Sequence, residues 1–541
     1  MNYIRKTIAR KLHPIVELPE DKILQQIKTP PNPEMGDAAF PCFMLAKKMH
    51  KSPAEIAGEL AAAFTEDSSF AAVSAAGPFV NFTFRTSKLA EVLLRDICRR
   101  GSEFGASEKG SGETIVIEYS SPNIAKPMGI HHIRTTMIGN SLSRIYEKCG
   151  YRCVRMNYIG DWGTSFGKLI YALKNWGGDK VNYTTKELND LYVRFNKEAE
   201  GKPELEDRAR AEFSALEKGE AQPVQAWEKI KKESLRQFQD IYEQLGVEFD
   251  VYSSESEYYQ SAAAVIEEAD AAGITVESDS AHVVPLDDGP PCILRKRDGS
   301  TIYGVRDLAA AIDRKKKYGF SRMLYVVAHS QSLHFKQVFG VLRKLGYSWA
   351  DDCKHIPFGL ISFADAKMST RKGNVLYLRD VLDEAVARVR DKVKTSAPHL
   401  LEKEDVLRQV ATGAVVFADL SSKRMKDVTF RWEEILNFEG ETGPYLQYTH
   451  ARCRSILRKA GEAPVDDADW DALATDREKA VLKNIDGFPD AIKRAVSENE
   501  PSIICGALIN IAAAFNSFYH AEKVIQEDRD KMMARLLLVH C

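Results

Sequence analysis

The sequence predicts a multidomain α/β protein: a doubly wound parallel sheet, an α+β N-terminal domain and an all-α C-terminal domain. Residues 114–160 form a strand, a helix and a strand, which is the β-α-β unit of a parallel sheet. A second series of strands and helices between residues 301 and 363 favours the same kind of sheet. From about residue 380 strand signals fade and amphipathic helices continue to the end, which predicts the helical domain.

Size, charge and cysteine content limit the class of protein. The chain has 541 residues, 44% hydrophobic and 28% charged, which is typical of a soluble protein of several domains. It has 75 Lys and Arg against 77 Asp and Glu, so nucleic acid could be bound only through local basic faces. Nine cysteines without a C-x-x-C pair favour a reducing compartment over a zinc site or a disulfide framework. With no signal-peptide pattern and no run of about 20 apolar residues, we expect a cytoplasmic protein without a membrane partner.

Composition shifts along the chain predict the domain boundaries. An N-terminal domain over 1–108 alternates amphipathic helices with strand-like runs such as GPFVNFTF and ends in a Gly/Ser-rich linker. The sheet domain is expected over 109–365, with a charged helical insertion at about 165–285. A loop region over 366–435 and a helical domain over 436–541 complete the chain.

Two lysine-bearing loops are predicted to bind a nucleotide. NIAKPMGIHH follows the strand TIVIEY and precedes a helix expected from about Ile133 to Cys149, where backbone amides favour phosphate. KMSTRKGN (367–374) follows the last strand of the second series. In an open α/β sheet both loops lie outside the carboxyl ends of the strands. Neither a P-loop nor a G-x-G-x-x-G motif is present, so a P-loop ATPase or a dinucleotide enzyme has no support.

The two loops resemble the signatures of class I aminoacyl-tRNA synthetases, which carry H-I-G-H after the first strand of a Rossmann-like sheet and K-M-S-K-S late in it. KMSTR matches the second signature, with Thr370 in place of its second lysine. SSPNIAKP, NYIGDWGTSFGKLI and YGVRDLAAAIDR resemble the arginyl-tRNA synthetases specifically. The N-terminal NPEMGDAAFPCFMLAKKM and the C-terminal FEGETGPYLQYTHARCRSI extend the resemblance over nearly the whole chain.

The resemblance implies that ATP, L-arginine and tRNA(Arg) give arginyl-tRNA, AMP and pyrophosphate. Mg²⁺ would accompany the nucleotide, without a protein metal site, and the protein would be a monomer. The N-terminal domain resembles the module that binds the tRNA corner, and the C-terminal domain resembles the anticodon-binding module. The basic clusters DRKKKY, SSKRMKD and ARCRSILRK are then expected to contact tRNA phosphates.

Adenylate formation builds negative charge on phosphate oxygens, which fixed cations and hydrogen-bond donors stabilise. The predicted catalytic residues are Lys126, His132, Lys367 and Arg371. The predicted ATP contacts are Gly129, His131, His132, Met368, Ser369 and Lys372. By the resemblance, Lys126 takes over the role of the missing second lysine of the later loop.

The amino-acid pocket must bind a planar cation, which favours a carboxylate and an aromatic wall. Tyr303 and Asp307 are four residues apart, so both can face one cavity from a helix or its start. From the residues alone, the favoured interpretation of this pair is a helix N-terminus with a capping Asp. By the resemblance, Tyr303 forms the wall and Asp307 pairs with the guanidinium. Glu118 and Gln331 complete the polar lining, and Asn123 positions the substrate.

The first signature is altered in this chain. Without a gap, Gly129 occupies the place of the first signature histidine and His131 that of the glycine, while His132 keeps its place. The chain also stops at MMARLLLVHC, where the family's last helix usually continues. We expect a rearranged but active site. The alternatives are a catalytically silent tRNA-binding paralogue and a class I synthetase for another amino acid.

Overall fold

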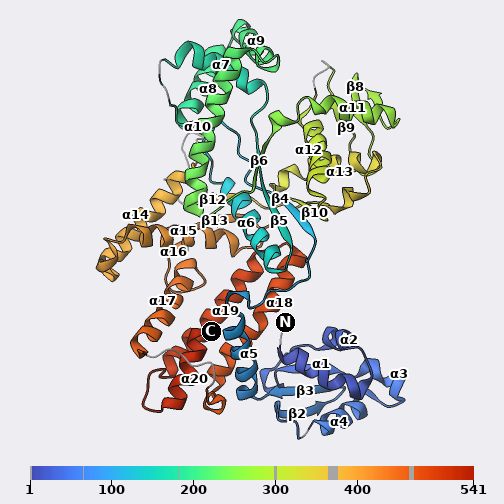
Figure 1. Ribbon diagram of the computed structural model, residues 1–541, viewed down its shortest axis with the longest axis vertical. Coiled ribbons are helices and arrows are strands. Elements are labelled where there is room, and N and C mark those ends of the chain that lie inside the picture. The colour runs from blue at the N-terminus through green and yellow to red at the C-terminus, as the bar shows by residue number, and fades with distance from the viewer. Residues whose placement is uncertain are drawn as a thin grey trace. The chain divides into compact units, whose positions relative to one another are not determined.

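The computed structural model describes residues 3–64, 66–178, 180, 182–297, 301–363, 376–461 and 468–541 (Figure 1). It divides into two compact units. Unit 1 comprises Met1–Ala106, Phe438–Glu498 and Ile503–Cys541, and unit 2 comprises Ser107–Asn437 with Asn499–Ser502. The two terminal regions of the chain therefore belong to one unit.

Unit 2 is built on a five-stranded parallel sheet with the spatial order β11-β10-β4-β5-β6. The strands are β4 (Thr114–Glu118), β5 (Arg152–Ile159), β6 (Val251–Ser254), β10 (Arg322–Tyr325) and β11 (Cys353–His355). The connecting helices include α6 (His132–Lys148), α12 (Tyr303–Tyr318) and α13 (Ser332–Lys344). The order reverses between β4 and β10, and such a switch point is where open α/β sheets bind ligands. The predicted doubly wound parallel sheet is confirmed.

The predicted helical insertion is shorter than expected and is followed by strands. Its helices are α7 (Thr164–Trp176), α8 (Thr185–Ala199), α9 (Pro203–Glu217) and α10 (Ala221–Leu245). β6 then joins the central sheet beside β5, so assigning 165–285 wholly to an insertion was wrong. With only four residues, VYSS, β6 is too short to show a clear alternation. After the turn η4 (Glu255–Glu257) come α11 (Ser261–Ala271) and an antiparallel sheet of β7 (Val276–Ser278), β8 (Ala281–Val284) and β9 (Cys292–Arg295).

The strand before the second predicted signature does not join the central sheet. β12 (Ile361–Phe363) pairs in parallel with β13 (Val428–Phe430), so placing that loop after the last strand of the doubly wound sheet was wrong. The partner strand lies 67 residues further along the sequence, and no local sequence pattern predicts the pairing. The remaining elements are η5 (His329–Gln331), η6 (Ser348–Asp352), α14 (Leu378–Ser396), η7 (Pro398–Leu400), α15 (Glu404–Leu420) and α16 (Trp432–Ile435).

Unit 1 joins the N-terminal and C-terminal regions in one apolar core, which contains Phe40, Phe82, Phe518 and Leu537 among others. Its N-terminal elements are α1 (Tyr3–Val16), α2 (Glu20–Gln26), η1 (Pro33–Met35), β1 (Ala38–Pro41), η2 (Phe43–Leu45), α3 (Ala46–Met49), α4 (Pro53–Ala63), β2 (Phe70–Ala76), β3 (Phe79–Phe84), α5 (Thr86–Arg100) and η3 (Gly101–Glu103). Its C-terminal elements are α17 (Gly443–Ala460), η8 (Trp470–Ala472), α18 (Asp476–Glu498), α19 (Ser502–Ala521) and α20 (Arg529–His540). Asp37 pairs with Lys479 and Lys483, both at 2.9 Å, so ion pairs also join the two regions.

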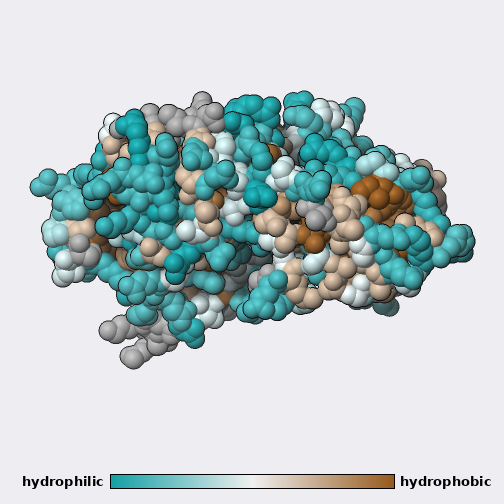
Figure 2. All heavy atoms as spheres, turned by 90° about the horizontal axis from the view of Figure 1, so that it is seen from below, coloured by the Kyte–Doolittle hydropathy of each residue, from teal (hydrophilic) through white to brown (hydrophobic). Residues whose placement is uncertain are grey.

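By length and apolar composition, α19 could cross a membrane, a possibility that the sequence analysis did not anticipate. This is weak evidence, because the core helix of a soluble protein passes the same test. Phe515 and Phe518 of α19 lie in the core of unit 1. The face of the molecule in Figure 2 is covered mainly by hydrophilic residues, and hydrophobic ones gather in small groups.

Candidate functional site

The loop after β4 is a strained backbone held by hydrogen bonds. Ser120, Ser121 and Ala125 have positive φ angles of 71°, 46° and 66°, which residues other than glycine rarely adopt. Buried side chains hold the backbone amides: Thr135 accepts from Ser120 at 3.0 Å, and Ser234 from Ala125 at 3.0 Å. Such strain persists only where the surroundings impose it, and it gathers at functional sites. The loop therefore presents its side chains in a fixed geometry.

Asn123 is exposed on this loop, and its position depends on a glycine of the next strand end. The backbone amide of Ile124 donates to the carbonyl of Gly160 at 3.1 Å, and that of Gly160 donates to Pro122 at 3.1 Å. A Cβ atom on Gly160 would lie 2.0 Å from Oδ1 of Asn123. Gly160 in the motif NYIGDWG therefore makes the room that Asn123 occupies.

Lys126 is exposed beside the helical insertion. Its ammonium nitrogen lies 5.6 Å from the centroid of the Tyr192 ring on α8. At that distance a cation is attracted to the face of the ring. The contact restrains a long side chain beside the loop.

The first signature segment is bonded to the chain that flanks the second one. The amide of Ile130 donates to Leu376 at 2.8 Å, and the amide of Leu378 donates to Met128 at 2.8 Å. Gly129, which is buried, forms an isolated bridge with Tyr377. Residues 376–378, which follow the second signature, thus lie against the predicted phosphate loop.

Arg134 anchors the chain segment that precedes the second signature. Its guanidinium, only 1% exposed, donates to the carbonyls of Gly359 at 2.9 Å and Lys426 at 2.9 Å, and pairs with Asp419 at 2.8 Å. Burial raises the pKa of Asp419 to about 6, although Arg134 opposes the rise. Both ends of the 364–375 stretch are therefore tied to residues 128–134. The predicted residues Lys367, Met368, Ser369, Arg371 and Lys372 lie outside the described residues.

His131 and His132 stand at the start of α6 with their ring centroids 4.1 Å apart. Burial, with a smaller effect from His131, lowers the pKa of His132 to about 3, so its imidazole is neutral near pH 7. Its Nδ1 lies 3.2 Å from the carbonyl oxygen of Gly129. Because a carbonyl only accepts, Nδ1 carries the proton and Nε2 is left as an acceptor. His131 is exposed, and its φ of −61° is an ordinary helical value.

Three carboxylates, which we call the carboxylate cluster, are linked electrostatically, because Asp307 acts on both of the others: Glu118, Glu255 and Asp307. Glu118 ends β4 and pairs with the buried Arg314 at 2.5 Å. Burial raises the pKa of Glu118, with Arg314 opposing and Asp307 adding to the rise. Glu255 follows β6 and pairs with Arg306 at 3.0 Å. Burial raises its pKa to about 7; Arg306 opposes the rise and Asp307 adds to it.

Asp307 differs from the other two carboxylates because its partner is an imidazole. Oδ2 of Asp307 lies 2.7 Å from Nε2 of His334, on α13. The ring centroid of His334 lies 4.9 Å from that of Tyr303, whose side chain is 53% exposed. The structure thus brings the predicted pair Tyr303 and Asp307 onto one face of α12. Gln331, the last residue of η5, is exposed just before α13.

Several of these residues were missed or misassigned by sequence analysis. Arg314 belongs to the cluster DRKKKY, but it is only 1% exposed and serves the sheet edge, so its assignment to tRNA was wrong. A charge run does not reveal which member points inward. Arg424 of SSKRMKD is likewise bound internally, to the carbonyls of Pro357 and Asn499. Glu255 was missed because β6, the strand before it, is too short to be recognised from the sequence.

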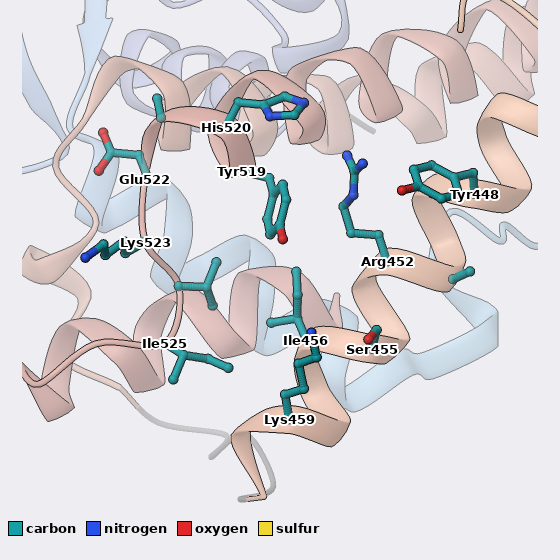
Figure 3. A pocket seen from close by; sticks show the side chains of 13 residues that line it. Tyr448, Arg452, Ser455, Ile456, Lys459, Tyr519, His520, Glu522, Lys523 and Ile525 are labelled. Carbon is teal, nitrogen blue, oxygen red and sulfur yellow. The ribbon is translucent and has the colours of Figure 1, made fainter. Parts of the chain in front are cut away.

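The third basic cluster lines a surface pocket of about 830 Å³ in unit 1 (Figure 3). Arg452 of α17 stands between the rings of Tyr448 and Tyr519, at 4.7 and 4.9 Å from their centroids. Lys459 and His520 add polar groups to the lining. Exposed aromatic faces beside cations are the chemistry that binds unpaired bases and their phosphates.

Comparison with known proteins agrees with this geometry. The model described as tRNA synthetases class I (R), catalytic domain, matches residues 95–432. The DALR anticodon binding domain matches residues 446–541, and the arginyl tRNA synthetase N terminal domain matches residues 2–84. A parallel sheet with the first signature at its switch point, matched over more than half of the chain by this family model, defines a class I aminoacyl-tRNA synthetase.

The relatives narrow the class. The arginine–tRNA ligase of Alkaliphilus metalliredigens is 44% identical over 96% of this chain and 92% of its own, and that of Clostridium perfringens is 44% identical over 100% and 96%. The chain belongs to the arginyl-tRNA synthetase family, which confirms the predicted resemblance. Two solved structures share the fold. The Thermus thermophilus arginyl-tRNA synthetase has a TM-score of 0.76 at 24% identity over 95% of this chain and 92% of its own. The Plasmodium falciparum enzyme has a TM-score of 0.79 at 21% identity over 98% and 95%.

Proposed function

We propose that this chain joins L-arginine to tRNA(Arg) in two steps, forming arginyl-adenylate from ATP and then arginyl-tRNA. The charge of the carboxylate cluster carries this proposal. Arg314 pairs with Glu118, and Arg306 pairs with Glu255. Asp307, by contrast, has no arginine partner among the described residues. One further guanidinium is therefore the group that would complete the cluster.

In this proposal Asp307 pairs with the substrate guanidinium and the exposed ring of Tyr303 covers one of its faces. Glu118, behind these two residues, adds negative charge to the pocket, and this charge is partly balanced by its ion pair with Arg314. Asn123, fixed by Gly160, positions the amino acid, and Gln331 lines the entrance. A neutral amino acid would leave the Asp307 carboxylate without a cation, and this disfavours a synthetase for another amino acid.

The triphosphate would lie along residues 126–132. Lys126 supplies a charge, and the N-terminus of α6 supplies the positive end of the helix dipole. A bound triphosphate would raise the pKa of His132, so that Nε2 gains a proton and donates to the phosphates. Lys367, Arg371 and Lys372, with Met368 and Ser369, keep the roles that the resemblance implies; the anchored flanks of their stretch support this. In the described part of the chain no cluster of three or more His, Cys, Asp or Glu could hold a metal, so Mg²⁺ would enter with ATP.

We assign the pocket of Figure 3 to the anticodon loop of the tRNA, with Tyr448 and Tyr519 as stacking platforms and Arg452 between them. The match to an anticodon-binding domain supports this assignment. We expect the protein to act as a monomer in the cytoplasm, without a membrane partner; its nine free cysteines suit a reducing compartment.

ATP–pyrophosphate exchange with arginine, run with and without tRNA(Arg), tests the proposal. Arginine-dependent exchange in the presence of tRNA is expected. No exchange under any condition, with tRNA binding retained, would establish the silent paralogue instead. Exchange that requires a different amino acid would remove Asp307 from guanidinium recognition.

A further inference from the structure

His334 connects the two residues proposed to hold the substrate side chain. It is the third residue of α13, while Tyr303 and Asp307 occupy the first and second turns of α12. The imidazole hydrogen-bonds to Asp307 and lies against Tyr303. A Cβ atom on Gly304 would lie 3.5 Å from Cε1 of His334, so the ring packs closely on the start of α12.

The imidazole is itself held in place. The His334 side chain is 12% exposed, and its ring centroid lies 5.1 Å from that of Phe335. Phe335 stacks in turn on His355 at 4.7 Å. A rigid imidazole can fix the orientation of a carboxylate that is 22% exposed and would otherwise rotate in water.

The chemistry of the contact leaves Asp307 able to bind a second donor. Because a carboxylate only accepts, Nε2 of His334 is the donating nitrogen. The bond engages Oδ2, so Oδ1 and the remaining lone pair of Oδ2 stay available for a guanidinium. His334 gives Asp307 a single imidazole donor, whereas Glu118 and Glu255 each pair with a guanidinium.

We propose that His334 is a positioning residue for arginine recognition, which orients the Asp307 carboxylate and supports the Tyr303 ring without touching the substrate. This rests on the proposed role of Asp307. Losing the contact would misalign the carboxylate and the guanidinium, which costs about 10- to 100-fold. The cost falls on arginine, because residues 126–132 serve ATP independently.

The test compares His334→Ala and His334→Gln by steady-state pyrophosphate exchange with saturating tRNA. We expect His334→Ala to raise KM for arginine about 10- to 100-fold and to leave KM for ATP and the unfolding temperature nearly unchanged. His334→Gln, whose amide can still donate to Asp307, should recover most of the arginine affinity. His282→Ala removes an imidazole that pairs with Asp270 and Glu277, outside the carboxylate cluster, and should leave KM for arginine within about twofold.

A double-mutant cycle with Asp307→Asn separates this inference from the proposed function. If His334 acts through Asp307, His334→Ala adds little to the Asp307→Asn variant. Fully additive effects, or an unchanged KM for arginine in His334→Ala while Asp307→Asn raises it, would overturn the positioning role alone. An unchanged KM for arginine in Asp307→Asn itself would overturn the proposed pocket.

Discussion

The two halves of the candidate site are held in different ways. The signature segment, residues 120–134, is fixed by its backbone: strained φ angles, amides bonded to buried side chains, and bridges to residues 376–378. The carboxylate cluster is fixed by its side chains, each carboxylate depending on one partner. In this chain the signature has changed at two positions, whereas the predicted pair of α12 is intact.

The difference has a physical basis. A triphosphate offers many oxygens and is bound by amides, a helix N-terminus and any nearby cation, so one side chain can replace another. A guanidinium has a fixed planar geometry and needs a carboxylate at one place. Changes at the two altered signature positions, Gly129 and His131, should therefore be tolerated more readily than changes in the cluster, provided that the backbone anchors persist.

The largest effect should come from removing the Arg134 side chain, which anchors the backbone of neighbouring segments. Arg134→Leu would leave Asp419 buried without a partner and would remove the donor to the carbonyls of Gly359 and Lys426. We expect a loss of about 3 to 5 kcal/mol in the free energy of unfolding, measured with denaturant. Because burial keeps the pKa of Asp419 raised, the folded state retains its proton while the unfolded state loses it above about pH 4. The loss should therefore be smaller near pH 5 than at pH 8.

The matched variant for this anchor is Arg134→Leu combined with Asp419→Leu. Removing both charges avoids a lone buried carboxylate, so the double variant should be more stable than Arg134→Leu alone. A single variant as stable as the wild type would show that residues 128–134 do not depend on this anchor.

Part of this arrangement was predictable from the sequence. The β-α-β unit, the order of the motifs and the joint placement of Tyr303 and Asp307 follow from local patterns. His334 could not be found in this way, because nothing in the spacing of residues 307 and 334 indicates that their side chains meet. Arg314 was misassigned because burial is invisible in the run DRKKKY. Contacts set by the packing of distant elements require the structure.

The second effect concerns charge in the signature segment. Lys126→Ala removes the ammonium that lies over Tyr192 and should slow adenylate formation about 100-fold, as when one preorganised donor to a transition state is lost. Single-turnover formation of arginyl-adenylate measures it. Lys197→Ala, at an exposed lysine on α8, serves as the control and should change the rate less than twofold. If arginine or tRNA binding weakened while the single-turnover rate stayed unchanged, Lys126 would act in substrate binding and not in adenylate formation.

A smaller effect on KM for arginine should come from changing the pH, because the pH sets the ionisation of the carboxylate cluster. With its pKa near 7, Glu255 is mostly protonated at pH 6 and mostly ionised at pH 8, and only the ionised form attracts a guanidinium. KM for arginine should therefore fall about tenfold from pH 6 to pH 8. Asp307, Arg306 and Asp161 act on the same group. Glu255→Gln should therefore be compared over the same range. A dependence that survives in Glu255→Gln would belong to another group.

The smallest effect is expected at His131, which occupies the place of the signature glycine. Here His131 is exposed and has an ordinary helical backbone, so nothing in its conformation requires the family's glycine. His131→Gly should keep pyrophosphate exchange within about threefold of the wild type, at a stability cost of about 0.5 to 1 kcal/mol from the freer backbone. His132→Ala removes the imidazole that keeps the signature position and should cost at least 100-fold. A greater loss from His131→Gly than from His132→Ala would mean that the ring of His131 has taken over the catalytic contact. The phosphate site would then depend on individual side chains as strongly as the carboxylate cluster does.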